Sequence, residues 1–460
     1  MIYALALVLL ILLTPDYSSP FSPELIVTLS VIYGLLVIYF FNQHKRVTKN
    51  WVRFDVFFII GYTIVHFQLP FYGALGLEPA YAAADIWPNK SIVNYATWMS
   101  TVAITLWMWG YQWILFRRMN VKKKEIFRRF NVNLYKFDIF LLISLIVFLS
   151  IVGSDFFKGI YDGGRSWGEG ANYAYLVLRL ALYLRIVYFL SSFSKGAHIK
   201  EIFNKLFTNK LFVAVLGIYT FLFLVSGDRG PVMHVTLILA GSYAFFIRPV
   251  SFKAIVILSS AAAIIFTIIS LGRTRNADDL QDTNIFARGY ENFQHSRDDI
   301  NITAELAGSV RVQYRALEYV PYRYPYLNGL PLLLSIAGTV PFGASTVIKT
   351  FNIPEMYTSS SSFLNIIVKG EGYTSGDGSE ILSDIYINFG VYGTFVIMFL
   401  FGMASSHIYN KANAGSFIYF LVLIILLYYG LYMSRAMLFT PLKDIISIIF
   451  LDYLFRKLLK

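Results

Sequence analysis

Arginine is the residue type in this sequence that points most directly to chemistry. Arg273 and Arg275 directly follow one apolar segment, and Arg229 lies in a short turn between two others. A planar guanidinium binds phosphate oxygens through two parallel hydrogen bonds, which a lysine ammonium cannot do. These arginines are therefore candidates for binding a phosphate or pyrophosphate group. The candidate set also includes Arg179, Arg311, Arg315 and Arg435.

Two carboxylates share one face of the apolar segment that begins near residue 381. Glu380 and Asp384 are four residues apart and Asn388 follows after four more, so all three lie on one side of a helix. Such a pair can act as a general base and its orienting partner. An acidic turn that complements the helix dipole is the alternative, and it explains Glu380 better than the deeper Asp384. Tyr373, Tyr386 and Asn388 are candidates for binding sugars, although tyrosine is also common at membrane interfaces.

The turn SGDRG, Ser226–Gly230, is a further candidate anion site. Its two glycines allow a tight turn that exposes backbone N–H groups, and a turn that opens a helix binds anions readily. Asp228 is a candidate sugar ligand in this turn. In the simpler alternative, Asp228 and Arg229 only neutralise each other in a helical hairpin.

The elements that position these residues are expected to be membrane-spanning helices. The 460-residue chain is 57% hydrophobic and 14% charged, whereas soluble domains are about 25% charged. We predict an all-α polytopic membrane protein with about twelve spans, each near the 20 residues that cross a bilayer. The first segment lacks the basic start and cleavage site of a signal peptide, so it counts as a span. The predicted spans are 1–13, 23–41, 54–74, 93–116, 137–152, 173–194, 211–226, 231–247, 254–272, 381–409, 416–433 and 438–454.

Lysine and arginine set the predicted orientation, because they favour cytoplasmic loops. They gather in every second loop, for example Lys195, Lys200, Lys205 and Lys210 after the sixth span. Both termini are then cytoplasmic. The SGDRG turn, Arg435 and a long loop are predicted on the outer side of a plasma membrane.

Three regions follow from this topology: the first nine spans over 1–272, a large outer loop over 273–380, and the last three spans over 381–460. Loops of this length are usually functional or disordered, and this one is too rich in tyrosine and arginine for disorder. Within it, 328–351 is apolar but interrupted by proline and glycine. We expect this stretch to be a re-entrant or interfacial segment that dips into the outer leaflet, where it is covered by protein or lines a cavity.

Several kinds of chemistry find no support in the sequence. The chain has no cysteine, and its six histidines show no metal-binding spacing. No phosphate-binding loop of the nucleotide-binding types occurs. The net charge of +12 follows from the basic cytoplasmic loops and does not indicate nucleic acid. We therefore expect no metal and no cofactor, and membrane lipid as the surroundings.

The motifs and layout resemble the Wzy-type polymerases of O-antigen and other oligosaccharide repeat units. The resemblance rests on a span ending in SGDRG, a later one ending in GRTR, the large loop, and SEILSDIYINFGVYG opening the next span. It implies a GT-C-like helical fold and transfer of a growing glycan from one polyprenyl-pyrophosphate carrier to a second carrier-linked unit. Arg229, Arg273 and Arg275 would bind the pyrophosphate, and Asp384 or Glu380 would be the base. A chain-length regulator and a flippase would be partners.

Three alternatives stay open at the level of sequence. An O-antigen ligase would use the same donor and a histidine in its outer loop, for which His295 is available. A GT-C transferase of single sugars would need an acidic pair in its first outer loop, where Asp16 and Glu24 are the candidates. A transporter is the third, but its usual internal repeats are not visible.

Replacement of Arg273 or Arg275 by alanine is expected to abolish long-chain glycan while leaving membrane insertion intact. Lysine at either position should restore the product only in part, because it cannot form the bidentate contact. Gel profiles of cell-surface glycan test this. Unchanged chain-length ladders in both alanine variants would contradict the assignment.

Overall fold

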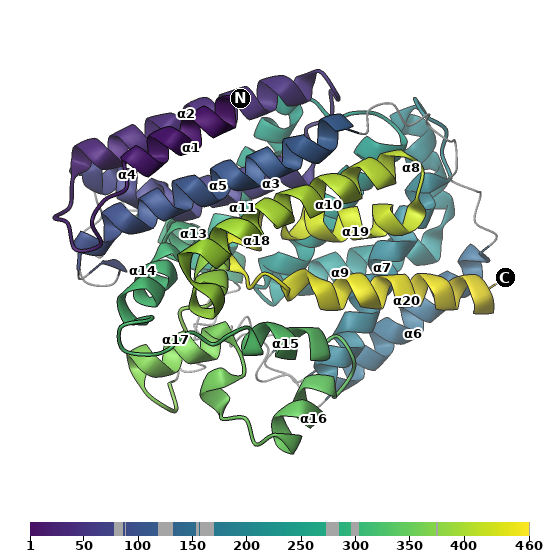
Figure 1. Cartoon of the computed structure of the whole chain (residues 1–460). Helices are drawn as coiled ribbons and strands as arrows, with labels where there is room; N and C mark the ends of the chain where they lie inside the picture. The colour runs from purple at the N-terminus through teal and green to yellow at the C-terminus, as the bar shows by residue number, and fades with distance from the viewer. Residues whose placement is uncertain are drawn as a thin grey trace. The chain divides into compact units, whose positions relative to one another are not determined.

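In the computed structural model, helices are the regular secondary structure of the described residues, and no strand occurs among them (Figure 1). This confirms the predicted all-α class. The chain folds into two compact units. Unit 1 comprises Met1–Thr48, Phe54–Ile126 and Thr303–Ile446, and unit 2 comprises Lys49–Arg53, Phe127–Ile302 and Ser447–Lys460. The described residues are 1–77, 86–87, 89–117, 132–152, 156, 170–272, 285–295, 303–373 and 376–459.

Unit 1 is built around two long helices, α5 and α18, which lie side by side (Figure 1). Glycine allows their backbones to approach closely: a Cβ atom on Gly402 would lie 2.1 Å from the carbonyl oxygen of Trp107, and one on Gly110 2.2 Å from that of Phe399. The helices of unit 1 are α1 (Ile2–Leu12), α2 (Pro23–Lys45), α3 (Phe54–His66), α4 (Gln68–Ala74), α5 (Ser91–Arg117), α13 (Ala304–Ala307), α14 (Val310–Tyr319), α15 (Leu330–Ala337), α16 (Gly343–Thr350), η4 (Glu355–Tyr357), α17 (Ser360–Lys369), α18 (Ile381–Asn413), α19 (Phe417–Tyr429), η5 (Gly430–Arg435) and the start of α20 (Thr440–Leu458).

Helices α2, α5 and α18 run in the same direction. At their starts, the backbone N–H of Ser22 donates to Asn94 Oδ1 over 3.1 Å and joins α2 to α5. At their ends, Asn410 Nδ2 donates to the carbonyl of Ile114 over 3.1 Å and joins α18 to α5. The three starts, which the topology predicts at the outer boundary, therefore lie at one end of unit 1.

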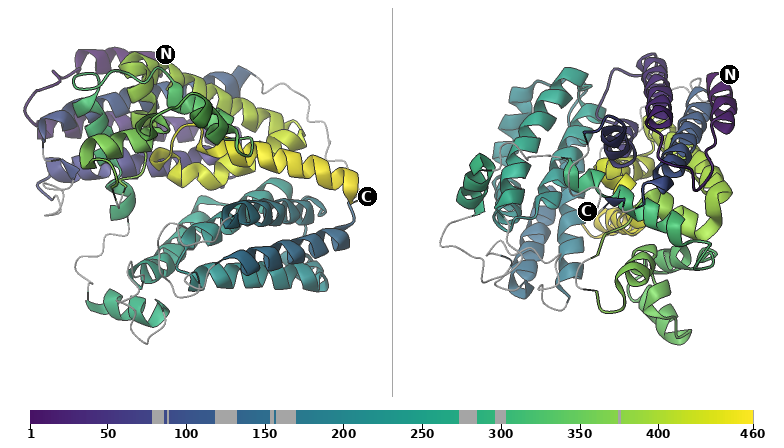
Figure 2. Two further views of the ribbon diagram at one scale, coloured as in Figure 1. Left: turned by 90° about the horizontal axis from the view of Figure 1, so that it is seen from below. Right: turned by 90° about the vertical axis from the view of Figure 1, so that its left-hand side faces the viewer.

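The helices of unit 2 form a second bundle (Figure 2). An ion pair is buried in it: Arg185 donates to both carboxylate oxygens of Asp138, over 2.7 and 3.2 Å. Removing one partner of such a pair typically costs about 3–5 kcal/mol. Arg185 therefore has a structural partner within its own bundle. The helices of unit 2 are α6 (Leu134–Ile151), α7 (Ala171–Ser191), α8 (Ile199–Thr208), α9 (Lys210–Val225), α10 (Arg229–Phe246), α11 (Phe252–Leu271), α12 (Ile285–His295) and the remainder of α20.

Each predicted span coincides with one helix or with a pair of consecutive helices. Among the described residues, five helices are long and apolar enough to cross a membrane: Pro23–Lys45, Leu134–Ile151, Ala171–Ser191, Ile381–Asn413 and Phe417–Arg435. Two bent pairs raise this number to seven: α3 with α4, bent by 41°, and α8 with α9, bent by 96°. The chain is therefore a multi-pass membrane protein, while a total of twelve spans and a GT-C-like arrangement stay predictions.

The interrupted segment 328–351 folds as a hairpin of two short helices, α15 and α16. Several of its apolar side chains are exposed, among them Leu333, Val340 and Phe342. Insertion of this hairpin into the membrane stays a prediction, and these side chains are the ones that would enter the lipid.

The close contact of α5 and α18 gives a stability prediction. Gly402→Ala should lower the apparent melting temperature by several degrees, because an added methyl group meets backbone and overpacking costs about 1–3 kcal/mol. Gly34→Ala is the matched control: it lies in α2 with nothing within 4 Å of the added atom, so the protein should melt no earlier than the parent. Thermal unfolding in detergent measures both, and an unshifted Gly402 variant would show that the helices do not pack as described.

Candidate functional site

The site candidates divide between the two units. Unit 1 contains Glu380, Asp384, Asn388, Tyr373, Tyr386, Arg311, Arg315 and Arg435, and unit 2 contains Arg179, Asp228, Arg229 and His295. Arg273 and Arg275 lie outside the described residues, and the side chain of His295 does too. The unit 1 candidates collect around the start of α18.

Three cationic side chains converge on one carboxylate in unit 1. Arg311 and Arg315, one turn apart on α14, both pair with Asp377, the former over 3.3 Å. Lys369 Nζ, at the end of α17, donates to the same carboxylate over 2.9 Å. Asp377 is nearly buried, whereas the three cations keep between 23% and 31% of their side chains exposed. Solvent, or a ligand, can therefore reach the cations but hardly the carboxylate.

Helix α17 holds the segment that carries Asp377. The backbone N–H of Asp377 donates to Asn365 Oδ1 over 2.8 Å, and Ser361 Oγ donates to the carbonyl of Gly378 over 2.8 Å. Gly378 has φ +83°, a left-handed conformation that favours glycine. The carboxylate is thus fixed by local backbone contacts as well as by its ion pairs.

Arg435 reaches the same segment from η5. The backbone carbonyl of Arg435 accepts a hydrogen bond from Ser379 Oγ over 3.3 Å. The side chain of Arg435 is also close to this segment: its Nε lies 3.9 Å from the point where a Cβ atom would lie if Gly378 had one. Its Nη1 donates to Glu305 Oε1 over 2.8 Å. We call Arg311, Arg315, Lys369, Arg435, Asp377 and Glu305 the cation cluster. Its four cations outnumber its two carboxylates.

The pKa of Lys369 reflects the other positive charges in the cluster. Burial, and then the neighbouring guanidiniums of Arg315 and Arg311, lower the pKa of Lys369 below its usual range. Repulsion from the two guanidiniums therefore adds to the effect of burial on Lys369. A further anion placed at their exposed side would be attracted.

Glu380 is fully buried at the first turn of α18. Its two carboxylate oxygens accept from the backbone N–H groups of Leu382 and Ser383, both over 2.6 Å. His66 Nε2 lies 3.3 Å from Oε1 of Glu380, and Nδ1 of the same ring lies 3.2 Å from Gln313 Oε1. The side chain caps the helix as the acidic-turn interpretation requires, and it also ties α18 to α3 and α14.

Asp384 is almost fully buried one turn further along. Its carboxylate accepts from the hydroxyl of Ser360 and, over 2.8 Å, from the backbone N–H of Leu438. Asn388 Nδ2 donates to the carbonyl of Asp384 over 2.7 Å, and its Oδ1 accepts from the backbone N–H of Gly329 over 3.0 Å. The predicted face of Glu380, Asp384 and Asn388 therefore exists and is held by hydrogen bonds from three other segments.

The two candidate sugar-binding tyrosines differ in exposure. Tyr386 is buried, and its hydroxyl donates to the carbonyl of Val320 over 2.8 Å. Tyr373 is half-buried, with its ring 3.6 Å from the position of a Cβ atom on Gly376. Tyr373 thus lies close to the segment that carries Asp377.

The SGDRG turn in unit 2 contains a carboxylate, that of Asp228, at the start of α10. Asp228 caps α10 by accepting from the backbone N–H of Gly230 over 3.2 Å, so its carboxylate occupies the helix N-terminus that the sequence suggested for a ligand. Arg229 is the first residue of α10. Arg179 stacks over the ring of Tyr175, with Cζ 5.3 Å from the centroid.

Sequence reasoning missed Lys369, Asp377, Gln313 and His66. One signal for Asp377 existed: it lies between two glycines in GDGSE, directly before the acidic face of α18. Lys369 could have been noticed as the basic end of the apolar stretch SSSFLNIIVKG. No local pattern links Gln313 and His66 to Glu380, because their contact is purely tertiary.

The capping role of Glu380 gives a testable consequence. Glu380→Gln should destabilise the protein by about 1–3 kcal/mol, because the amide cannot accept two backbone N–H groups and leaves a buried donor without an acceptor. Glu371→Gln, an exposed residue of the same loop, is the matched control and should leave unfolding unchanged. Chemical or thermal unfolding in detergent distinguishes them; equal stability of the two variants would rule out the cap as a stabilising contact.

Comparison with known proteins gives one match that covers almost the whole chain. A family model described as O-antigen polysaccharide polymerase Wzy matches residues 1–456. No curated protein and no solved structure matches the chain.

Proposed function

The chain belongs to the O-antigen polysaccharide polymerase Wzy family, whose members join O-antigen repeat units, and we propose that its cation cluster binds the pyrophosphate of a lipid-linked donor. The donor would carry the growing glycan on a polyprenyl pyrophosphate. The acceptor would be a second carrier-linked repeat unit. This makes the chain a glycosyltransferase that needs no nucleotide sugar.

The proposed reaction exchanges one bond at the anomeric carbon. The bond between this carbon and the pyrophosphate oxygen breaks, and the electron pair leaves with the carrier pyrophosphate. A glycosidic bond to an acceptor hydroxyl oxygen forms, and the hydroxyl proton passes to a base. Because the leaving group is already activated, the protein has to supply positioning and charge stabilisation.

The single observation that carries the proposal is the convergence of Arg311, Arg315, Lys369 and Arg435 around residues 377–379. Arg311, Arg315 and Arg435 were candidates from sequence, although Arg435 lies far from the other two along the chain. Guanidinium pairs suit the planar, bidentate recognition of phosphate oxygens. The cations outnumber the carboxylates of the cluster and are partly exposed, which favours a ligand with more than one negative charge.

We assign Asp377 a positioning role. Its carboxylate holds Arg311, Arg315 and Lys369 in one place before the ligand arrives. Orientation in advance lowers the entropy that binding would otherwise cost. A pyrophosphate would then bind at the exposed side of cations that are already in place, and binding would not have to bring them together from separate helices.

Of the two carboxylates on α18, we propose Asp384 as the base and Glu380 as its orienting partner. Glu380 accepts from two N–H groups of its own helix, so freeing it would unwind the first turn. Asp384 accepts from the hydroxyl of Ser360 and from the backbone N–H of Leu438, both outside α18, so its release would leave the first turn of the helix intact. Catalytic hydrogen bonds often tighten only in the substrate complex, so burial of Asp384 in the free protein is compatible with this role.

The remaining candidates keep their proposed roles. Tyr373, Tyr386 and Asn388 are proposed sugar ligands beside the cluster. Asp228 is a proposed sugar ligand. Arg229, Arg273 and Arg275 are proposed pyrophosphate ligands on the strength of the family resemblance, and Arg179 is proposed as one because it lies within a predicted span. His295 is proposed as a second candidate base. We place the reaction at the outer face of the plasma membrane with both termini cytoplasmic, on the strength of the lysine and arginine distribution among the loops. The common end of α2, α5 and α18 agrees with the predicted alternation of these three spans. A flippase and a chain-length regulator are the proposed partners.

Kinetics of purified variants test the cation cluster. Arg315→Ala should lower the rate of repeat-unit coupling by about 10²-fold or more, as loss of a charge-stabilising donor does in other enzymes. Arg315→Lys should recover only part of the rate, because the point charge remains while the bidentate contact is lost. Arg323→Ala is the matched control, since this exposed arginine lies just after α14 and stacks over Tyr319. Equal rates for Arg315→Ala and Arg323→Ala would overturn the proposed pyrophosphate site.

A further inference from the structure

Helix α8 is amphipathic, although the sequence stretch that contains it was expected to be only a basic loop. Its apolar residues recur every third or fourth position, which places them along one side of the helix. They are Ile199, Ile202, Phe203, Leu206 and Phe207, and the other side carries Lys200, Glu201, Asn204, Lys205 and Thr208.

Most of this apolar side has no cover from unit 2. Ile202 is buried, but Ile199 and Phe207 are each 62% exposed and Phe203 is 51% exposed. The rings of Phe203 and Phe207 stack on each other with centroids 6.4 Å apart. Two phenylalanines and an isoleucine thus form a continuous apolar strip on the surface of unit 2.

The direction of α8 relates this strip to the membrane. Only Asn209 separates α8 from α9, and the two helices meet at 96°. Helix α9 is strongly apolar, and together with α8 it is long and apolar enough to be a membrane span. If α9 runs across the bilayer, a helix at nearly a right angle to its start lies along the surface of the bilayer.

The charges around α8 have the sign that attracts acidic lipid. Lys195, Lys200, Lys205 and Lys210 are all exposed, and Glu201 is the acidic residue of the helix. Arg248 adds to them, since its Nη2 donates to the carbonyl of Gly196 over 2.5 Å at the same end of unit 2. Basic residues near an apolar strip are the composition of helices that bind the headgroup region.

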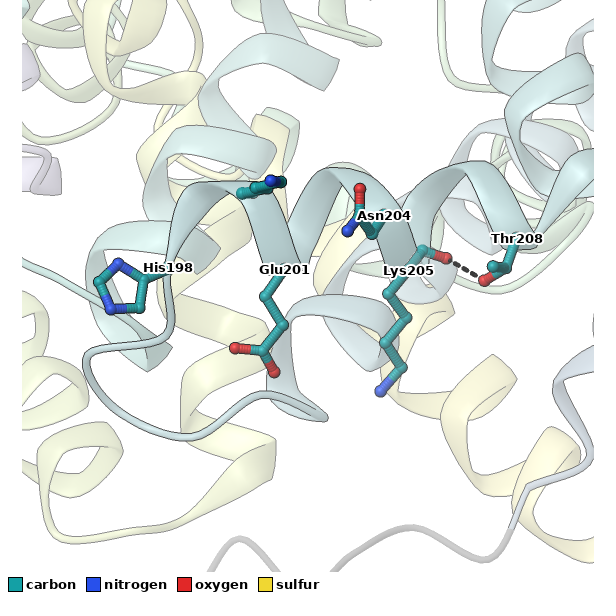
Figure 3. Close-up of a pocket in the computed structure, with 6 residues that line it drawn as sticks. His198, Glu201, Asn204, Lys205 and Thr208 are labelled. Carbon is teal, nitrogen blue, oxygen red and sulfur yellow. Dashed lines mark hydrogen bonds between the residues drawn. The ribbon is translucent and has the colours of Figure 1, made fainter.

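The polar side of α8 is open to solvent. A surface pocket lies along it, lined by His198, Lys200, Glu201, Asn204, Lys205 and Thr208 (Figure 3). Lys205 is anchored to the end of α7, where its Nζ donates to Ser192 Oγ over 3.0 Å and lies 4.7 Å from the ring centre of Phe193. Lys200 extends from the part of the helix next to the exposed strip and is the better placed of the two to reach a headgroup.

We propose that α8 lies in the interface of the membrane at the lysine-rich end of unit 2 and binds acidic phospholipid there. Ile199, Phe203 and Phe207 enter the acyl boundary, while Lys195 and Lys200 contact the phosphates of the headgroups. The net positive charge and the right angle with α9 favour a lipid surface over a protein partner. This inference rests on the membrane character of the chain and not on the polymerase chemistry, so the two can fail separately.

The absence of cysteine in the chain makes a direct test possible. A single cysteine at Phe203, F203C, is labelled with an environment-sensitive fluorophore, and the full-length protein is placed in vesicles with brominated lipids. Label at F203C should be quenched most strongly by bromine near the headgroup end of the acyl chains. The matched control is N204C on the polar side of the same turn, where quenching should be weak.

Lipid selectivity is measured with the same labelled protein. At equal mole fraction, brominated phosphatidylglycerol should quench F203C more than brominated phosphatidylcholine. Lys200→Gln should lower this preference by about fivefold, the effect expected of one basic residue near an acidic surface. Lys349→Gln, an exposed lysine of α16, is the matched control and should leave the preference unchanged.

Three results would overturn the proposal. No quenching at F203C would show that the strip faces water or protein. Strongest quenching by bromine at the chain ends would make α8 part of a broken span. Equal quenching by the two lipids would show that α8 has no preference for acidic lipid. This conclusion would hold whether or not the protein couples repeat units.

Discussion

The hydrogen bonds of Glu380 set the geometry on which the rest of unit 1 depends. A helix that begins inside protein leaves N–H groups without partners, and in apolar surroundings each one is costly. Glu380 accepts from two of them, while His66 and Gln313 connect the same carboxylate to α3 and α14. The start of α18 is thereby fixed against the two helices that flank it. Asp384 and the segment with Asp377 lie on either side of this cap and are held further by their own contacts with α17 and with Leu438.

Charge around this fixed point is distributed in two layers. The carboxylates Glu380 and Asp384 are buried and hydrogen-bonded, whereas Arg311, Arg315 and Lys369 lie partly exposed above Asp377. A ligand that approaches the start of α18 therefore meets cations first. In the proposed reaction, the anionic leaving group would bind to the partly exposed cations, and the acceptor hydroxyl would point toward the buried carboxylates. The family to which the chain belongs joins repeat units, and the proposed pyrophosphate site and proposed base would serve the two partners of that reaction.

Hydropathy predicted the positions of the long apolar helices, because each such segment can be recognised without knowing what it packs against. It did not reveal α8, since ten residues with an apolar strip are too short and too charged for a span and look like a basic loop. The partner of Arg185 also escaped prediction, because Asp138 lies on another helix and only packing brings them together. Arg311, Arg315 and Arg435 were candidates by residue type alone. Their meeting point at residues 377–379 depends on tertiary contacts of α14, α17 and η5, which no spacing in the sequence encodes.

The most direct measurement is a reaction of the purified protein with one defined repeat unit linked to polyprenyl pyrophosphate, without any nucleotide sugar. The products are separated as a glycan ladder, and the released carrier pyrophosphate is counted. The account predicts a ladder in which each new glycosidic bond is matched by one released carrier pyrophosphate. A ladder that needs a nucleotide sugar, transfer of a single unit without a ladder, or bond formation without carrier release would contradict it.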